Sequence, residues 1–331
     1  MCMTTCSDPW ADACTIGGAT GSATRDGAPI IFSNSDDPFA TRTRLVVVDP
    51  ADGYKFIAAQ IVSPPPPVSF NLMHTRGLNA AGLAYSWASV APSNEPTSDV
   101  AIGIPYNQFG RLILSQARTV ADVIALIERY PRAYHGNFLF ADAEGTVALI
   151  EISTQTYHVE TQITDGAFAR TNHWISLEMV PLGTAQVGQA SRERYERASE
   201  LIVAQAGTID AESLTRITAD HHGLDTSGIS ICAHGGAPGA RHHRGGTVSS
   251  EISEPRKGRF WYCYGWPCGS APENPDLQVY QDRSWGAYLP FDLAGLEPGE
   301  YVTTDGRLTA RAIKYLAMAR TAEPAGVHAT I

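Results

Sequence analysis

The chain has 331 residues, of which 34 are acidic and 24 are lysine or arginine, so its formal net charge is −10. This acidic balance, with only short basic clusters, argues against a nucleic-acid-binding protein, because neutralising phosphates takes clustered lysine and arginine. No apolar run approaches the ~20 residues that cross a bilayer, and the start of the chain lacks the basic and apolar regions of a secretory signal, so we expect a cytoplasmic protein that does not bind membranes.

The cysteines are too sparse for a disulfide scaffold and form no C-x-x-C pair. Adjacent histidines such as His221 and His222 do not fix a ligand geometry, and no acidic pattern completes a site. The sequence therefore predicts no metal ion and no cofactor. One or two cysteines are then candidates for a chemical role, and the six are Cys2, Cys6, Cys14, Cys232, Cys263 and Cys268.

The first part of the chain contains short strand-like runs separated by glycine, proline and aspartate turns. We expect strands over residues 28–34, 44–48, 55–62 and 82–88. A helix is predicted after Thr119, because apolar residues recur every three or four positions and Asp122 stands in the capping-box position. Pro131 should end that helix.

The second part alternates between strands and helices without a helix after every strand. The predicted strands are 137–141, 146–152, 228–232, 247–252 and 259–265, and the predicted helices are 191–206 and 210–219. Parallel βαβ units would need regular alternation. Antiparallel sheets with helices packed outside them, in an α+β single domain, fit this order better.

The most informative stretch is a cysteine followed by a predicted hairpin. Cys14 opens a strand, Asp26 and Gly27 form a turn, and a second strand ends in Asn34-Ser-Asp36. This places polar groups beside the cysteine. The glycine-rich segment 17–21 lacks the spacing of a dinucleotide-binding loop, and we interpret it as a turn.

Further motifs follow in order, and together they carry a resemblance. They are Gly77-Leu-Asn-Ala-Ala-Gly-Leu, Thr171-Asn-His, Ser191-Arg-Glu-Arg-Tyr-Glu-Arg, Ser230-Ile-Cys-Ala-His and Gly265-Trp-Pro-Cys. With the cysteine hairpin they make the chain resemble the acyl-coenzyme A:isopenicillin N acyltransferase-like proteins, relatives of choloylglycine hydrolase among the N-terminal nucleophile (Ntn) hydrolases. The resemblance covers residues 14–268 and implies a four-layer αββα sandwich.

The resemblance also implies a mechanism. Cys14 would become the N-terminus by self-cleavage after Ala13, which removes residues 1–13 as a propeptide and leaves residues 14–331 as one domain. Its thiol would attack a carbonyl while its own α-amine acts as the base. Asp36 would orient that amine, and Asn172 would donate to the oxyanion, with Ser89 as a second donor.

Three features limit or compete with this interpretation. Cys2 would be exposed by removal of Met1, as in choloylglycine hydrolases, but no comparable hairpin follows it, which favours Cys14. Ser33 stands where choloylglycine hydrolases have arginine and the penicillin acyltransferase has glutamine. Ala233 stands where many relatives have a basic residue, so bile-acid-like and penicillin substrates are in doubt.

The sequence thus predicts an autoprocessing N-terminal-cysteine amidohydrolase that cleaves a linear amide bond of a small N-acyl or peptide-like substrate through an acyl-thioester. The first alternative is an acyltransferase that passes the acyl group to an amine. The second is a non-catalytic binding protein on the same scaffold. Tyr85, Trp87 and Trp174 are candidate substrate-binding residues because of their aromatic character, and a homo-oligomer is left open.

Overall fold

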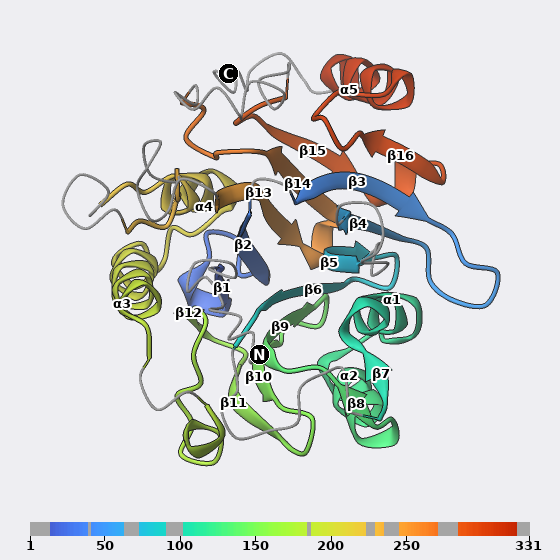
Figure 1. Ribbon diagram of the computed structural model, residues 1–331. Coiled ribbons are helices and arrows are strands. Elements are labelled where there is room, and N and C mark those ends of the chain that lie inside the picture. The colour runs from blue at the N-terminus through green and yellow to red at the C-terminus, as the bar shows by residue number, and fades with distance from the viewer. Residues whose placement is uncertain are drawn as a thin grey trace, which may run out of the picture.

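The computed structural model describes residues 14–38, 41–62, 73–90, 102–183, 187–222, 229–234, 245–270 and 284–322. Their strands form two large antiparallel sheets (Figure 1). The six-stranded sheet has the order β12 (Gly166–Arg170), β1 (Thr15–Thr20), β2 (Ile30–Pro38), β13 (Gly245–Glu254), β14 (Arg259–Tyr264), β15 (Tyr288–Asp292).

The eight-stranded sheet combines strands from both ends of the chain. Its order is β11 (Tyr157–Ile163), β10 (Val147–Ile152), β9 (Gly136–Asp142), β6 (Leu83–Ala88), β5 (Met73–Asn79), β4 (Phe56–Val62), β3 (Arg42–Val48), β16 (Gly299–Val302). A short parallel pair is formed by β7 (Ile104–Pro105) and β8 (Arg132–Ala133).

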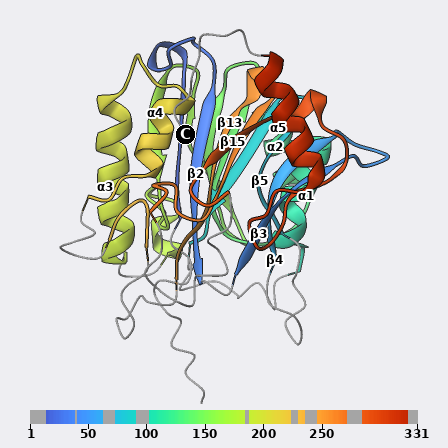
Figure 2. The ribbon, with the colours of Figure 1, turned by 90° about the horizontal axis from the view of Figure 1, so that it is seen from above.

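Helices cover the outer faces of both sheets, as Figure 2 shows from the side of the layers. The helices are α1 (Tyr106–Gln116), α2 (Val120–Arg129), α3 (Gln189–Ala204), α4 (Ala211–Thr218) and α5 (Ala310–Ala322). α1 and α2 pack on the eight-stranded sheet, α3 and α4 pack on the six-stranded sheet, and α5 contacts β16. The four-layer αββα sandwich predicted from the sequence is confirmed.

Three hydrophobic clusters hold these layers together, one between the sheets and one under each pair of covering helices. β2 shows how the sequence serves two of them. Ile31 points between the sheets, whereas Ile30 and Phe32 point toward α3 and α4, because side chains alternate along a strand. A strand that is apolar on both faces is therefore fixed in the middle of the sandwich.

The predicted cysteine hairpin is present, since β1 and β2 pair antiparallel with Thr15 opposite Asn34. The helix predicted after Thr119 is α2, and the capping box of Thr119 and Asp122 is formed on both sides. None of the helices in the described ranges is both long enough and apolar enough to cross a membrane.

Two local predictions were wrong. Gly17 and Gly18 lie within β1 and not in a turn. Glycine is needed here because an added Cβ would lie 2.5 Å from Phe32 at Gly17 and 2.7 Å from Val147 at Gly18. Small residues here let β1 pack closely against its neighbours. The predicted strand 228–232 is irregular over 229–232, where side-chain contacts take the place of strand pairing: the side-chain amide of Asn34 donates to the carbonyl of Ile231 at 2.8 Å.

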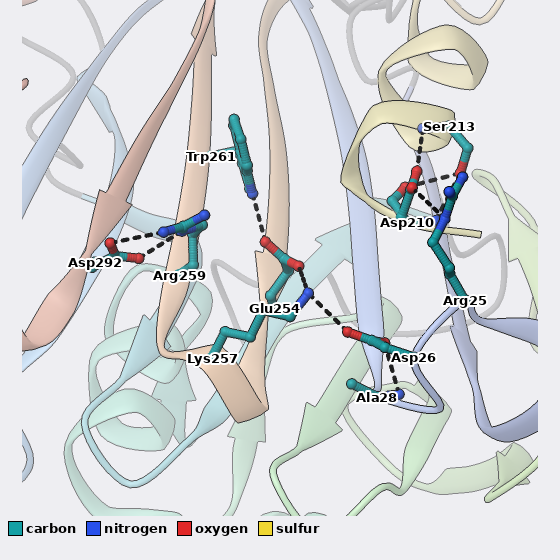
Figure 3. A network of polar contacts seen from close by, with 10 residues as sticks. All are labelled: Arg25, Asp26, Ala28, Asp210, Ser213, Glu254, Lys257, Arg259, Trp261 and Asp292. Carbon is teal, nitrogen blue, oxygen red and sulfur yellow. Dashed lines mark hydrogen bonds and ion pairs between the residues drawn. The ribbon is translucent and has the colours of Figure 1, made fainter. Parts of the chain in front are cut away.

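A polar network lies around the turns that join β1 to β2 and β13 to β14 (Figure 3). Lys257 contacts Glu254 at 2.7 Å and Asp26 at 2.9 Å, and Arg259 pairs with Asp292 at 2.6 Å. These ion pairs connect neighbouring turns and strands at one end of the six-stranded sheet. The other end of β2 and β13 carries the polar groups of the candidate site.

Candidate active site

Cys14 lies directly before β1, at the end of the sandwich where β2 finishes. Its side chain is 7% exposed and belongs to the cluster between the two sheets. It also lines a cavity of about 260 Å³. The structure therefore places the predicted nucleophile at a cavity wall, where a small molecule has access to it.

The backbone of Cys14 is held on both sides. Its nitrogen donates to Oδ1 of Asn172 at 2.8 Å, and its carbonyl oxygen accepts from Nη1 of Arg194 at 2.6 Å. Arg194 is 3% exposed and also donates to the hydroxyl of Thr15 at 3.0 Å. These contacts leave the Cys14 backbone little freedom to move.

Asn172 connects the nucleophile to the predicted second donor. Its Oδ1 accepts from Nη2 of Arg194 at 2.9 Å as well as from Cys14, and its Nδ2 donates to the carbonyl and the hydroxyl of Ser89 at 2.9 and 3.3 Å. Because two donors meet one end of the amide, the orientation of its oxygen and nitrogen is fixed. Asn172, Ser89 and Cys14 thus lie together, as the sequence predicts.

Helix α3 explains why a Ser-Arg-x-Arg motif accompanies Thr-Asn-His. The hydroxyl of Ser191 accepts from the backbone nitrogen of Asn172 at 2.9 Å, and its carbonyl accepts from the hydroxyl of Thr171 at 2.8 Å. Arg194, one turn further along the helix, then reaches Cys14 and Asn172. The motif contributed to the resemblance, but no role for Arg194 was predicted from it; the signal in the sequence is a basic residue three positions after the serine.

Asp36 lies at the end of β2, 2% exposed, and shapes the charge around the thiol. Its Oδ1 accepts from the hydroxyl of Thr247 at 2.6 Å, whereas its buried Oδ2 has no hydrogen-bond partner among the described residues. Burial raises the pKa of Asp36 to about 7, against the opposing charge of Arg194 and the hydrogen bond from Thr247. An acceptor atom is therefore available beside Cys14 for a group that carries positive charge.

Arg76 is a site residue that the sequence analysis did not find. It extends from β5 across the space between the sheets, where its Nη2 donates to Sγ of Cys14 at 3.3 Å and to the carbonyl of Trp87 at 2.8 Å. Its Nε lies 3.8 Å from Glu251 of β13, and both side chains are at most 2% exposed. A guanidinium group beside the sulfur favours the thiolate.

Ser33 of β2 contacts Glu251, the acidic partner of Arg76. Its hydroxyl donates to Glu251 at 2.9 Å, from the position where choloylglycine hydrolases have arginine. The cation beside the thiol comes from β5 and not from β2. Arg76 directly precedes the motif that begins at Gly77 but is not part of it, so its place beside Cys14 became evident only from the folded arrangement of the two sheets.

The thiol is not activated in the full-length chain. Burial raises the pKa of Cys14 to about 11, and the positive charge of Arg76 offsets only part of that effect. The negative charges of Asp37 and Asp36 act in the same direction as burial. Attack by a thiolate near neutral pH therefore requires a further change at this site.

The cavity is polar near Cys14 and apolar or aromatic elsewhere. Besides Cys14, its lining consists of Asp37, Thr41, Ile61, Met73, Arg76, Trp87, Ser89, Tyr106, Tyr134 and His135. Of the three aromatic residues predicted to bind substrate, only Trp87 is in this lining. Ala13, the predicted cleavage-site residue, lies outside the described residues.

Tyr85 and Trp174 lie elsewhere, which corrects their predicted place at the cavity. Tyr85 is on the helix-facing side of β6 and stacks on Phe140 with ring centroids 5.6 Å apart. Trp174 packs with Val90 and Met179. Side-chain type alone could not show that both rings are used to fill hydrophobic clusters.

Metal ligation at the cavity itself is disfavoured by Arg76 and Arg194, whose charges oppose a cation beside Cys14. The group of described residues that could hold a metal ion consists of His221, Cys232, His234 and Cys268. None of these four lines the cavity.

Two solved structures of one enzyme resemble this fold. A variant of the conjugated bile acid hydrolase from Clostridium perfringens superposes with a TM-score of 0.54 and 13% identity, covering 89% of this chain and 99% of that one. A second mutant of the same hydrolase gives a TM-score of 0.53 and 14% identity over 88% and 98%. At this identity the likeness shows the Ntn-hydrolase fold. No curated protein matches the chain by sequence.

The sequence family is shown by a family model. The model described as acyl-coenzyme A:6-aminopenicillanic acid acyl-transferase matches residues 23–267, well over half of the chain. The match includes Asp36 and Asn172 but begins after Cys14. It confirms the resemblance seen in the motifs and the expected class of enzyme, one that acts on amide C–N bonds. The chain belongs to the acyl-coenzyme A:6-aminopenicillanic acid acyl-transferase family.

Proposed function

We propose that this protein is an autoprocessing cysteine amidohydrolase that cleaves a linear amide of a small N-acyl or peptide-like substrate through an acyl-thioester on Cys14. The observation that carries the proposal is the set of contacts around Cys14 at the cavity wall. Its nitrogen meets Asn172 and its sulfur meets Arg76. Once cleavage frees the nitrogen, this one residue would supply both the base and the nucleophile beside the same cavity.

Self-cleavage between Ala13 and Cys14 is the activating step. It converts the Cys14 amide nitrogen, which is no base, into an α-amine with a reference pKa near 8. The unpartnered Oδ2 of Asp36 supplies an acceptor for the ammonium form of that amine. The new positive charge also lowers the pKa of the thiol, which burial holds at about 11 before cleavage.

Acylation then proceeds with a balanced proton transfer. The α-amine takes the proton of the Cys14 thiol as the sulfur attacks the substrate carbonyl, and Arg76 stabilises the thiolate. In this proposal Nδ2 of Asn172 and the hydroxyl of Ser89 donate to the oxyanion, and the 3.3 Å contact from Nδ2 to that hydroxyl gives way to the substrate. The amine proton passes to the leaving nitrogen as the C–N bond breaks, which leaves an acyl-thioester.

Deacylation uses water in the same geometry. The α-amine takes a proton from the water that attacks the thioester, and the thiol regains a proton as the carboxylic acid leaves. Trp87, Tyr106 and Tyr134, with Ile61 and Met73, give the cavity an apolar wall suited to a small acyl group. A cavity of about 260 Å³ has room for such a group beside Cys14.

The intact mass of the purified full-length protein tests the proposal. The wild type should lack the first 13 residues, and Cys14→Ala should keep them. Cys2→Ala is the matched control and should process as the wild type does. A wild type that lacks only Met1 would identify Cys2 as the exposed cysteine, and an intact wild type with an unreactive Cys14 would support the non-catalytic binding protein.

Acyl transfer is the second candidate, and the acyltransferase description of the family favours it. It differs from hydrolysis only in the acceptor, because an amine replaces water at the thioester. Adding increasing concentrations of a primary amine to the processed enzyme distinguishes the two. A hydrolase keeps releasing mainly the free acid, whereas a transferase converts most of the acyl group into the new amide.

The cytoplasmic location expected from the sequence remains part of this proposal. The cysteines within the described ranges, Cys14, Cys232, Cys263 and Cys268, are free thiols. Free thiols fit a reducing compartment. They also allow cysteines other than the nucleophile to act as ligands.

A further inference from the structure

Two histidines and two cysteines from three separate segments meet beside the six-stranded sheet. These residues, called the Cys2His2 cluster here, are His221, Cys232, His234 and Cys268. The ligand atoms of the four side chains all lie within 4.8 Å of one another. Such convergence of donors from distant parts of a chain requires an explanation.

The individual distances place the donors around a common point. Nε2 of His221 lies 2.9 Å from Nε2 of His234, which in turn lies 3.2 Å from Sγ of Cys268. A tetrahedral Zn²⁺ has bonds of about 2.0–2.1 Å to nitrogen and 2.3 Å to sulfur, which separates its ligand atoms by about 3.3–3.8 Å. Small side-chain shifts therefore convert the observed arrangement into that geometry.

The chemistry of the donors selects the ion. Two thiolates and two imidazoles in a tetrahedral arrangement are typical of Zn²⁺, and four protein ligands leave no open position for substrate. We propose that the Cys2His2 cluster binds one Zn²⁺ ion as a closed, structural site. The site is distinct from the cavity, whose lining contains none of its ligands.

The surroundings of the cluster support its ligands as a structural zinc site requires. The ring of His234 stacks on Trp266, with centroids 3.9 Å apart and planes 4° from parallel. The backbone nitrogen of Ser270 donates to Sγ of Cys268 at 3.3 Å, and that of Cys232 donates to the carbonyl of Asp220 at 3.0 Å. These contacts fix ligand orientation independently of the ion.

The spacing of the four residues along the chain matches no common zinc-binding motif. Cys232 and His234 are two positions apart, His221 lies eleven residues before Cys232, and Cys268 follows only after β13 and β14. The absence of a C-x-x-C pair led to the prediction of no metal ion. The structure shows that three segments, and not one motif, bring the donors together.

A bound ion would connect the cluster to Asp36, and this consequence rests on the proposed function. Ala233, between two ligands, donates its N–H to the hydroxyl of Thr247 at 2.9 Å and accepts from the Thr247 nitrogen at 2.8 Å. The same hydroxyl donates to Asp36 at 2.6 Å. Fixing residues 232–234 therefore positions Thr247, and through it the carboxylate beside Cys14.

Metal analysis of the full-length protein, produced with Zn²⁺ in the medium, tests the site. We expect about one zinc per chain in the wild type and in Cys14→Ala, and less than about a tenth of that in His221→Ala and Cys268→Ser. His222→Ala is the matched control, since His222 is exposed and outside the cluster, and it should keep its zinc. Circular dichroism checks that each variant is folded.

Cobalt gives a second readout that does not depend on activity. Protein stripped of metal and loaded with Co²⁺ should show the intense visible bands of tetrahedral cobalt and a thiolate charge-transfer band, both lost in Cys268→Ser. Wild type without zinc and without these bands would overturn the site. A Cys232–Cys268 disulfide in protein purified under reducing conditions would also overturn it.

Self-cleavage separates the site from its proposed consequence. If the zinc positions Asp36, His221→Ala should process at Ala13–Cys14 at least about tenfold more slowly than His222→Ala. Loss of zinc with unchanged processing would keep the metal site and overturn its connection to Asp36. Zinc content that stays at about one in Cys14→Ala supports the site whether or not the amidase proposal holds.

Discussion

Two sets of charged side chains meet at β13, and they differ in their exposure to water. At one end Lys257, Glu254 and Asp26 form the network of Figure 3, in which the lysine is 46% exposed. Three residues before Glu254 along β13, Glu251 lies between the sheets with Arg76 of β5, beside Cys14, and both side chains are at most 2% exposed. Similar ion pairs made by two nearby glutamates of one strand therefore lie in opposite environments.

Burial distinguishes charges that have a chemical role from charges that merely lie on the surface. Exposed ion pairs are screened by water and salt and contribute little to stability. A buried pair loses its hydration, and the attraction between the two charges offsets only part of that cost. Stability alone therefore poorly explains the presence of such a pair. The charges of Arg76 and Asp36 modify the pKa of the Cys14 thiol. This effect on a nucleophile accounts for the two buried charges better than a contribution to stability does.

The largest expected effect follows from removing the buried cation. Arg76→Met should lower the free energy of unfolding by about 3–5 kcal/mol, because it leaves Glu251 buried without a positive partner. It should also slow alkylation of the Cys14 thiol at least tenfold, since Arg76 no longer stabilises the thiolate. Chemical denaturation and timed labelling with iodoacetamide measure the two effects.

The double variant Arg76→Met, Glu251→Gln separates the two roles of Arg76. Neutralising Glu251 removes the unpaired charge, so stability should recover by most of the loss while labelling of Cys14 stays slow. If labelling recovered together with stability, Arg76 would act on the fold and not on the thiol. If neither stability nor labelling changed in the single variant, the contrast between the buried and the exposed ion pairs would be wrong.

A smaller effect is expected in the pH dependence of stability. Burial raises the pKa of Asp36 to about 7 in the folded chain, above its value of 3.8 in the unfolded chain. The folded state then binds more protons between these values, so this group makes the protein less stable as the pH rises from about 4 to about 7. In the Cys14→Ala background, which keeps the chain uncleaved, adding Asp36→Asn should stabilise the protein at pH 7 and have little effect at pH 4.

The paired comparison is necessary because other groups titrate in the same range. Burial lowers the pKa of His74 and His173 to about 4, which makes the protein more stable as the pH rises and opposes the effect of Asp36. The difference between the two variants cancels these histidines. If the difference in the free energy of unfolding between the two variants were the same at pH 4 and at pH 7, the Asp36 carboxyl would titrate normally in the folded chain.

Local patterns predicted the parts of the fold that local forces decide. Turn residues and alternating apolar positions located the β1–β2 hairpin and the capping box located α2. β5 (Met73–Asn79) was not predicted, because Arg76 and polar neighbours break the alternation that marks a buried strand. The Arg76 side chain is buried in contact with Glu251 and Cys14, which belong to the other side of the sandwich.

The same limit applies to the site. Cys14, Asp36 and Asn172 were predicted from motifs next to turns and strand ends, and Ser89 from its register in a predicted strand; at such positions sequence and location are closely coupled. Arg76 and the Cys2His2 cluster depend on contacts between segments far apart in the chain, and no spacing rule encodes them. Tyr85 shows the opposite error, since an aromatic residue near a site motif serves the core under α1.

The smallest expected effect comes from the exposed ion pair. Lys257→Met replaces a cation with methionine, as Arg76→Met does, and it removes the ion pair with Glu254. We nevertheless expect a loss below about 1 kcal/mol in the free energy of unfolding. Two features limit the loss: the Lys257 side chain is 46% exposed, and Glu254 keeps a hydrogen bond of 2.8 Å from the indole nitrogen of Trp261. Raising the salt concentration should reduce even this loss, because salt screens the pairs of the wild type. Denaturation of both methionine variants at low and high salt measures the contrast directly; a loss at Lys257 as large as that at Arg76 would mean that burial does not decide the role of a charge in this fold.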